Sequence, residues 1–111
     1  KNNALINIHV PHPRHDDFIT DPTHVRPVTV AMLELYSKAN NELWAIMRAA
    51  NSPLGLIHNV NFEVVSSNLV VDERIRKKIE TGEIKRDELQ FYIDHHNNIV
   101  KQIDIKWRVI K

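Results

Sequence analysis

The sequence of 111 residues contains no cysteine, which excludes disulfide bridges and zinc sites built on thiolates. Glycine is scarce, with only two residues, and aromatic side chains make up 6% of the chain. So few glycines leave little capacity for tight turns, which argues against an all-β protein. No apolar run is long enough to span a membrane, and no signal-peptide pattern is visible.

The sequence also lacks a large excess of positive or negative charge. Fifteen Lys and Arg residues oppose fourteen Asp and Glu residues, so the net charge is +1. This balance argues against nucleic acid as a partner, because dedicated nucleic-acid binders usually present a strongly basic face. Hydrophobic residues at 42% and charged residues at 26% are typical of one modest globular domain. Near-neutrality suits a subunit that works inside a complex.

Residues 1–27 are predicted to form an extended arm rich in proline and histidine. Within it, Ile6, Ile8 and Val10 predict a short strand over residues 4–10. The prolines that follow push the backbone toward extended geometry. Because the arm has too few apolar residues to form a core alone, we expect it to lie against a neighbour.

Two helices are predicted after the arm, the first within residues 28–37. The second begins at Asn40 or Asn41, whose side chain would cap the first turn. Asn51 would take the left-handed position at the end of this helix, and Pro53 prevents its continuation.

The second helix carries an apolar stripe. Its members recur at helical spacing and are Leu43, Ile46, Met47 and Ala50. This spacing predicts a face that packs into the core, and Trp44 widens it.

The rest of the chain predicts strands, one helix and a hairpin. Alternation of apolar residues indicates a strand over residues 60–64, a turn at 66–68 and a second short strand at 69–71. Asp72 is expected to cap a helix over residues 73–80 that Gly82 ends. Residues 89–94 and 102–109 then alternate as two strands of a hairpin, with Trp107 as a core residue or an interface anchor.

The histidines raise the question of a metal site. His12, His15 and Asp16 offer the ligand types that zinc or non-haem iron prefers. The intervening prolines exclude a helix, so regular spacing does not bring these side chains to one face. No nucleophile lies in a recognisable motif, and no glycine-rich phosphate loop exists. We therefore expect no metal, no cofactor and no enzymatic activity.

One basic cluster lies on the predicted helix over residues 73–80. It consists of Arg74, Arg76, Lys77 and Lys78. Acidic residues surround it on both sides, a pattern typical of a solvated helix face and not of a phosphate-binding site.

The pair of predicted helices resembles the LysM-like domain of phage baseplates and related contractile injection machines. The resemblance covers residues 28–71 and is carried by Leu35, Tyr36, Leu43, Trp44, Ile46, Ala50, Asn51 and Pro53. The chain departs from the family at residues 66–68, where the family usually has a Pro-Gly turn, and at Asp72, where proline is common. This departure argues against transferring the glycan binding of cell-wall LysM domains.

The resemblance implies a LysM-like unit over residues 28–71. Together with the helix and hairpin that the residue patterns predict at 72–111, packed as one domain with this unit, the expected fold class is α+β. It also implies a structural subunit of a phage tail or baseplate, made in the host cytoplasm and located in the virion. Its partners would be other subunits in an oligomeric assembly, contacted or supported by Tyr36, Leu43, Trp44, Ile46 and Trp107. A small binding module for glycan (peptidoglycan) or nucleic acid is the alternative hypothesis, and a histidine-based metalloenzyme is the third.

Overall fold

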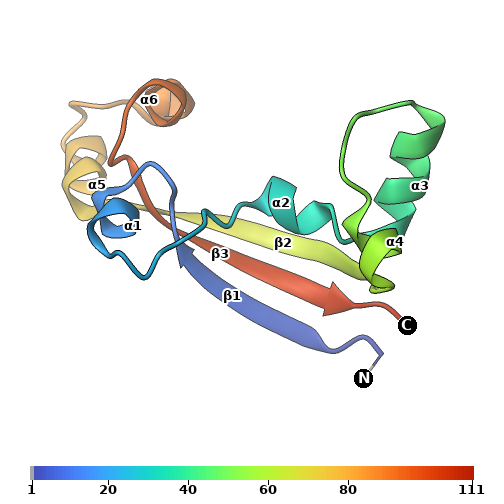
Figure 1. Ribbon diagram of the computed structural model, residues 1–111. Coiled ribbons are helices and arrows are strands. Elements are labelled where there is room, and N and C mark those ends of the chain that lie inside the picture. Colours follow the sequence, from blue (N-terminus) through green and yellow to red (C-terminus); the bar gives the residue numbers. More distant parts are fainter. Residues whose placement is uncertain (1) are drawn as a thin grey trace. The chain divides into compact units, whose positions relative to one another are not determined.

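The computed structural model describes residues 2–111 and confirms the α+β class (Figure 1). Within these residues the helices are α1 (Asp16–Thr20), α2 (Val30–Glu34), α3 (Lys38–Ile46), α4 (Leu54–His58), α5 (Glu73–Glu80), the short 3-10 helix η1 (Arg86–Glu88) and α6 (Leu89–His95). The strands are β1 (Leu5–Pro11), β2 (Phe62–Val71) and β3 (Val100–Val109). In the part of the chain described, no helix is long and apolar enough to cross a membrane.

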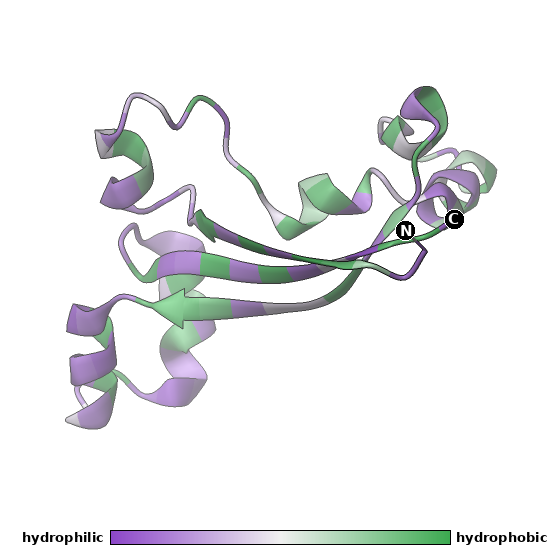
Figure 2. Cartoon of the chain, turned by 90° about the horizontal axis from the view of Figure 1, so that it is seen from below, coloured by the Kyte–Doolittle hydropathy of each residue, from purple (hydrophilic) through white to green (hydrophobic). Residues whose placement is uncertain are grey.

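The three strands form one antiparallel sheet in the order β1-β3-β2. The backbone N–H of Asp72 donates to the carbonyl of Ile99, and that of Ile110 donates to the carbonyl of Asn61, so β2 and β3 run in opposite directions. The period-two pattern of β3 is confirmed, because alternate residues such as Ile103 are buried. Figure 2 shows this alternation as green and purple bands along the strands.

The chain divides into two compact units. Unit 1 comprises the residues up to Ile8, Val28–Ser67 and Ile105–Lys111. Unit 2 comprises His9–Pro27 and Asn68–Asp104. Each unit therefore combines segments from all three of the ranges 1–27, 28–71 and 72–111.

Each unit has its own buried apolar residues. In unit 1 these are Leu33 and Ile105, and in unit 2 they are Ile84, Ile99, Val100 and Ile103. The capped helix predicted for residues 73–80 is confirmed as α5. The Asp72 side chain accepts from the N–H of Arg74, and Gly82 follows the helix with a φ of +80°.

The extent of α3 differs from the prediction. Ser37, and neither Asn40 nor Asn41, caps the helix by accepting from the N–H of Asn40. The helix ends at Ile46, and Arg48 takes the left-handed conformation predicted for Asn51. Asn41 does not cap the helix because its side chain makes hydrogen bonds to Leu35 and Leu56.

The turn predicted within the sheet was wrong. Residues 66–68 do not turn, and β2 runs unbroken from Phe62 to Val71. The continuous strand β3 beside it offers backbone partners that outweigh the turn preference of Ser and Asn.

The predicted hairpin strand over residues 89–94 is the helix α6. Leu89, Tyr92 and Ile93 are its less exposed residues and stand at helical spacing, whereas Phe91 is exposed. In this short segment the strand pattern and the helix pattern overlap, and β3 pairs with β1 and β2 instead.

The arm predicted for residues 1–27 is only partly extended. The predicted strand is confirmed as β1, which belongs to the sheet. Residues 16–20 form the helix α1, capped by His15, whose side chain accepts from the N–H of Asp17. Pairing with β3 supplies backbone hydrogen bonds that the arm cannot make by itself, although most side chains of β1 stay exposed.

Candidate functional site

The helices α3 and α4 of unit 1 expose large aliphatic side chains, which we call the α3–α4 apolar residues. They are Leu43 and Ile46 on α3, Met47 at the C-cap of α3, and Leu56 and Ile57 on α4. Ile46 is 81% exposed and Met47 65% exposed. Leu43, Ile46 and Met47 stand at positions i, i+3 and i+4 and therefore share one helix face. Single exposed aliphatic residues are ordinary, but here three share one helix face, which makes this face the candidate functional surface of unit 1.

The prediction that the apolar stripe of α3 faces the core is therefore wrong, because its side chains are exposed in the single chain. The inward residues are Asn41, which is 2% exposed, and Trp44, which is half-buried. They stand three residues apart on another face of α3. The helix is rotated in this way because Asn41 makes buried hydrogen bonds that an aliphatic side chain cannot make.

Asn41 and Gly55 hold α3 and α4 together. The Asn41 amide donates to the carbonyl of Leu35 over 2.9 Å, and its oxygen accepts from the N–H of Leu56 over 3.2 Å. A Cβ atom at Gly55 would lie 2.8 Å from the Tyr36 carbonyl oxygen and 2.9 Å from Asn41 Oδ1. Glycine is therefore required for the close approach of these two segments. The sequence patterns assign Asn41 a different role, as a helix cap, and do not single out Gly55, although the scarcity of glycine was a signal.

Tyr36 and Trp107, both predicted as core or interface residues, lie together in unit 1. The Trp107 ring stacks on Phe62 with centroids 4.0 Å apart, and Tyr36 meets Trp107 edge-on at 5.8 Å. Within the described chain, the buried Nε1 of Trp107 has no hydrogen-bond partner. This aromatic cluster packs the end of β3 against the start of β2 and contributes to the core of unit 1.

Trp44, the remaining predicted residue of this set, lies apart from that cluster. It lines a pocket of about 400 Å³ together with Met32 and Leu35. The pocket is mostly apolar and open to solvent.

Of the basic cluster, Arg74 alone forms an ion pair among residues 2–111. Arg74 donates from Nε to Asp72 Oδ1 over 3.1 Å and from Nη2 to Oδ2 over 3.3 Å. Arg76, Lys77 and Lys78 are exposed on α5. Arg74 is therefore engaged by its own capping residue, which weakens the cluster as a phosphate-binding site.

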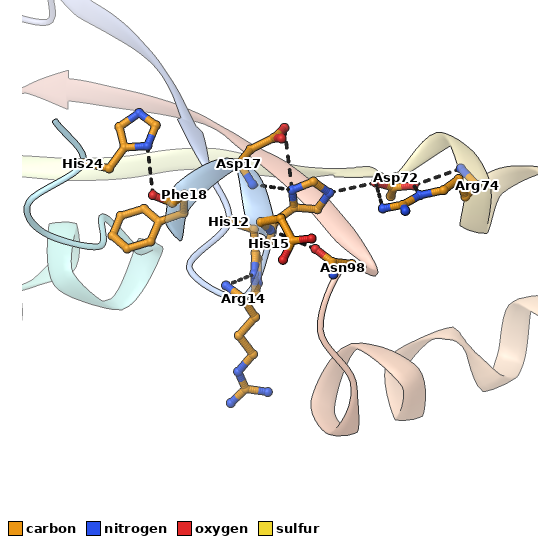
Figure 3. A network of polar contacts seen from close by, with 10 residues as sticks. His12, Arg14, His15, Asp17, Phe18, His24, Asp72, Arg74 and Asn98 are labelled. Atoms are coloured by element: carbon orange, nitrogen blue, oxygen red, sulfur yellow. Dashed lines mark hydrogen bonds and ion pairs between the residues drawn. The ribbon is translucent and has the colours of Figure 1, made fainter. Parts of the chain in front are cut away.

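The metal candidates lie in unit 2, where His15 forms a buried polar contact with Asp72 (Figure 3). His15 is 4% exposed, and its Nε2 lies 2.7 Å from Asp72 Oδ2. Its Nδ1 accepts from the N–H of Asp17 over 3.0 Å, so Nε2 carries the proton and donates to Asp72. Neither ring nitrogen has a lone pair free for a metal or for a proton from a substrate.

Of the other two metal candidates, His12 has one ring nitrogen engaged, because its Nδ1 accepts from the N–H of Arg14. Asp16 donates through its backbone N–H to Asn98 Oδ1, a contact that does not involve its carboxylate. Partial burial, and secondarily the Arg14 guanidinium, lowers the pKa of His12. Among residues 2–111, no three His, Asp or Glu side chains are grouped to hold a metal ion.

Asp72 is the most perturbed ionisable group of this region. The hydrogen bond from the Arg74 guanidinium, followed by that from His15, holds the pKa of the Asp72 carboxyl well below its usual range. Because His15 caps α1 and Asp72 caps α5, their hydrogen bond joins the beginnings of two helices.

Comparison of the chain with protein-family models, with curated proteins and with solved structures found no match. Residue chemistry and geometry are therefore the basis for a functional proposal.

Proposed function

We propose that the protein is a structural subunit of a phage-type tail or baseplate that works through protein–protein contacts. The observation that carries this proposal is the exposure of the α3–α4 apolar residues on two contacting helices. Burying one such side chain fully is worth about 1.5–3 kcal/mol, so five of them form a strong drive toward a partner. Leu43 and Ile46, which fail as core residues, serve as interface residues in this assignment.

The assignment to a tail or baseplate rests on the LysM-like resemblance of residues 28–71. In this proposal α2 and α3 are the helix pair of the LysM-like unit, and β2 is the strand that follows. The loops beside the helices carry glycan binding in cell-wall LysM domains, and here β2 runs unbroken through residues 66–68. This difference favours a connector that contacts other tail subunits in the virion.

The test compares two charge substitutions on α3. Ile46→Glu introduces a carboxylate among the α3–α4 apolar residues, and Ala45→Glu introduces the same group one residue earlier, on another face. Native mass spectrometry and analytical ultracentrifugation would measure the association of the purified chain. We expect defined oligomers for the natural chain and for Ala45→Glu. Association of Ile46→Glu should be weaker by about 10- to 100-fold, the value of one buried isoleucine.

Other outcomes would replace the proposal. A monomer that binds peptidoglycan fragments or an oligonucleotide saturably would indicate the binding-module alternative. A monomer that carries one divalent metal ion per chain would indicate the histidine-based hypothesis. Equal association of both variants would show that the α3–α4 apolar residues are not the contact.

A further inference from the structure

The strand β1 forms one edge of the sheet, and its backbone pairing defines which groups face outward. The N–H of Val109 donates to the carbonyl of Ala4, and the N–H of His12 donates to the carbonyl of Lys101. Eight residues separate these two pairs on each strand, so the register between β1 and β3 is unbroken. Even-numbered residues of β1 therefore direct their backbone groups toward β3.

The odd-numbered residues Leu5, Asn7 and His9 consequently direct their backbone N–H and carbonyl groups away from the sheet. The side chains agree with this register, because His9 lies opposite Asp104 and the two are joined by a contact of 2.7 Å. Since β3 is the sole neighbour of β1 in the described sheet, these outward groups form a free edge (Figure 1).

This edge lacks the usual protection against pairing. The seven residues of β1, Leu5–Pro11, include no Lys, Arg, Asp or Glu, and Leu5 is 53% exposed. Edge strands that must stay unpaired usually carry a charge or a central proline. The other edge differs, because the N–H of Phe62 at the start of β2 already donates to the carbonyl of Tyr36.

We propose that β1 pairs antiparallel with β1 of a second copy of this chain, about a two-fold axis at Asn7. This inference names a partner for the structural subunit and so rests on the proposed function. The three outward N–H groups, those of Leu5, Asn7 and His9, select the register. Pairing Asn7 with Asn7, and Leu5 with His9, uses all three donors. A shift by two residues in one direction would oppose Leu5 with Pro11, which has no N–H to donate. A shift in the other direction would oppose His9 with Asn3, whose N–H already donates to the Val109 carbonyl and whose φ is +62°.

The side chains are compatible with this register. Two uncharged amides meet at the axis, so no like charges oppose each other. On the other face Ile6 of one copy lies opposite Ile8 of the next, which forms aliphatic cross-strand pairs. The product is a six-stranded sheet in which neither copy retains a free β1 edge.

The test uses the absence of cysteine from the natural chain. Asn7→Cys places the two thiols in a directly opposed pair, where Cα atoms lie about 5.5 Å apart and a disulfide can form. Leu5→Cys is the matched control, because its two thiols would be offset by four residues along the strands, about 13 Å. Under mild oxidation we expect a covalent dimer from Asn7→Cys about tenfold faster than from Leu5→Cys. Equal rates, a faster Leu5→Cys or no dimer from either would overturn the proposal.

A reversible measurement keeps the proposal independent of disulfide formation. Asn7→Lys places like charges opposite each other at the axis, whereas Asn7→Thr is neutral and strand-compatible. The dimer dissociation constant, measured by analytical ultracentrifugation, should rise about tenfold or more for Asn7→Lys and little for Asn7→Thr. Equal dissociation constants for the two variants would contradict pairing at this edge.

The two proposals fail separately. Loss of association in Ile46→Glu without crosslinking of Asn7→Cys would uphold the α3–α4 contact and reject edge pairing. Crosslinking of Asn7→Cys with full association of Ile46→Glu would uphold edge pairing and reject the α3–α4 contact.

Discussion

At the scale of single residues, Asp72 connects several parts of unit 2 through one carboxylate. It caps α5, pairs with Arg74 and accepts from His15. Its pKa is lowered in the folded protein, so the folded state binds the proton more weakly than the unfolded chain does. Its contribution to stability is therefore complete above the ordinary aspartate pKa of about 4 and is lost as the pH falls further.

This linkage predicts that acid removes the contribution of Asp72 to the free energy of unfolding. Urea denaturation at several pH values should show the free energy of unfolding of the natural protein falling more steeply below about pH 4 than that of Asp72→Asn. At neutral pH, Asp72→Asn should lower that free energy by about 1–3 kcal/mol, because it removes the negative charge from the hydrogen bonds that Arg74 and His15 donate to this side chain. Parallel acid profiles for the two proteins would show that Asp72 is not the responsible group.

Gly55 supports a second prediction at the residue scale. In Gly55→Ala the new methyl group would lie within 2.9 Å of the Tyr36 carbonyl and of Asn41 Oδ1, and the carbonyl belongs to the backbone. We expect a loss of about 1–3 kcal/mol in the free energy of unfolding, measured by chemical denaturation. Gly82→Asn is the control, because no atom lies within 4 Å of its Cβ position and asparagine tolerates positive φ. A larger loss in the control would argue against close packing at Gly55.

At the scale of elements, the orientation of α3 decides which residues stabilise the fold. Ile46→Ser should change the free energy of unfolding by less than about 0.5 kcal/mol, because its side chain is exposed. Asn41→Leu should cost about 1–3 kcal/mol, since it removes the side-chain acceptor of the Leu56 N–H and one of the two hydrogen bonds to the Leu35 carbonyl, which also accepts from the Gly55 N–H. Thermal and urea denaturation of both variants would check this order. A larger loss for Ile46→Ser than for Asn41→Leu would show that the face of α3 that carries Ile46 packs into the core.

At the scale of the whole molecule, a net charge of +1 bears on how association responds to salt. Contacts made by apolar side chains and backbone hydrogen bonds are screened little by ions. We therefore expect the dissociation constant of the assembly to change less than about threefold between roughly 50 and 500 mM salt. A steep loss of association with salt would point instead to charged contacts, such as those of Arg76, Lys77 and Lys78.

The sequence by itself determined those features whose signals are local. The α+β class, the strand at residues 4–10, the strand at 102–109 and the helix over 73–80 with its Asp72 cap all follow from short-range patterns. A cap acts on the first turn of its helix, and alternation acts along one strand, so neither requires knowledge of distant residues.

The tertiary structure alone decided the features that depend on distant partners. Residues 66–68 remain in β2 because β3 lies beside them, and residues 89–95 form α6 because β3 takes β1 and β2 as its neighbours. The buried side of α3 is set by Asn41, which bonds to backbone groups of Leu35 and Leu56. An apolar stripe indicates that one face of a helix favours burial. In α3, the long-range hydrogen bonds of Asn41 determine that a different face packs against the rest of the chain.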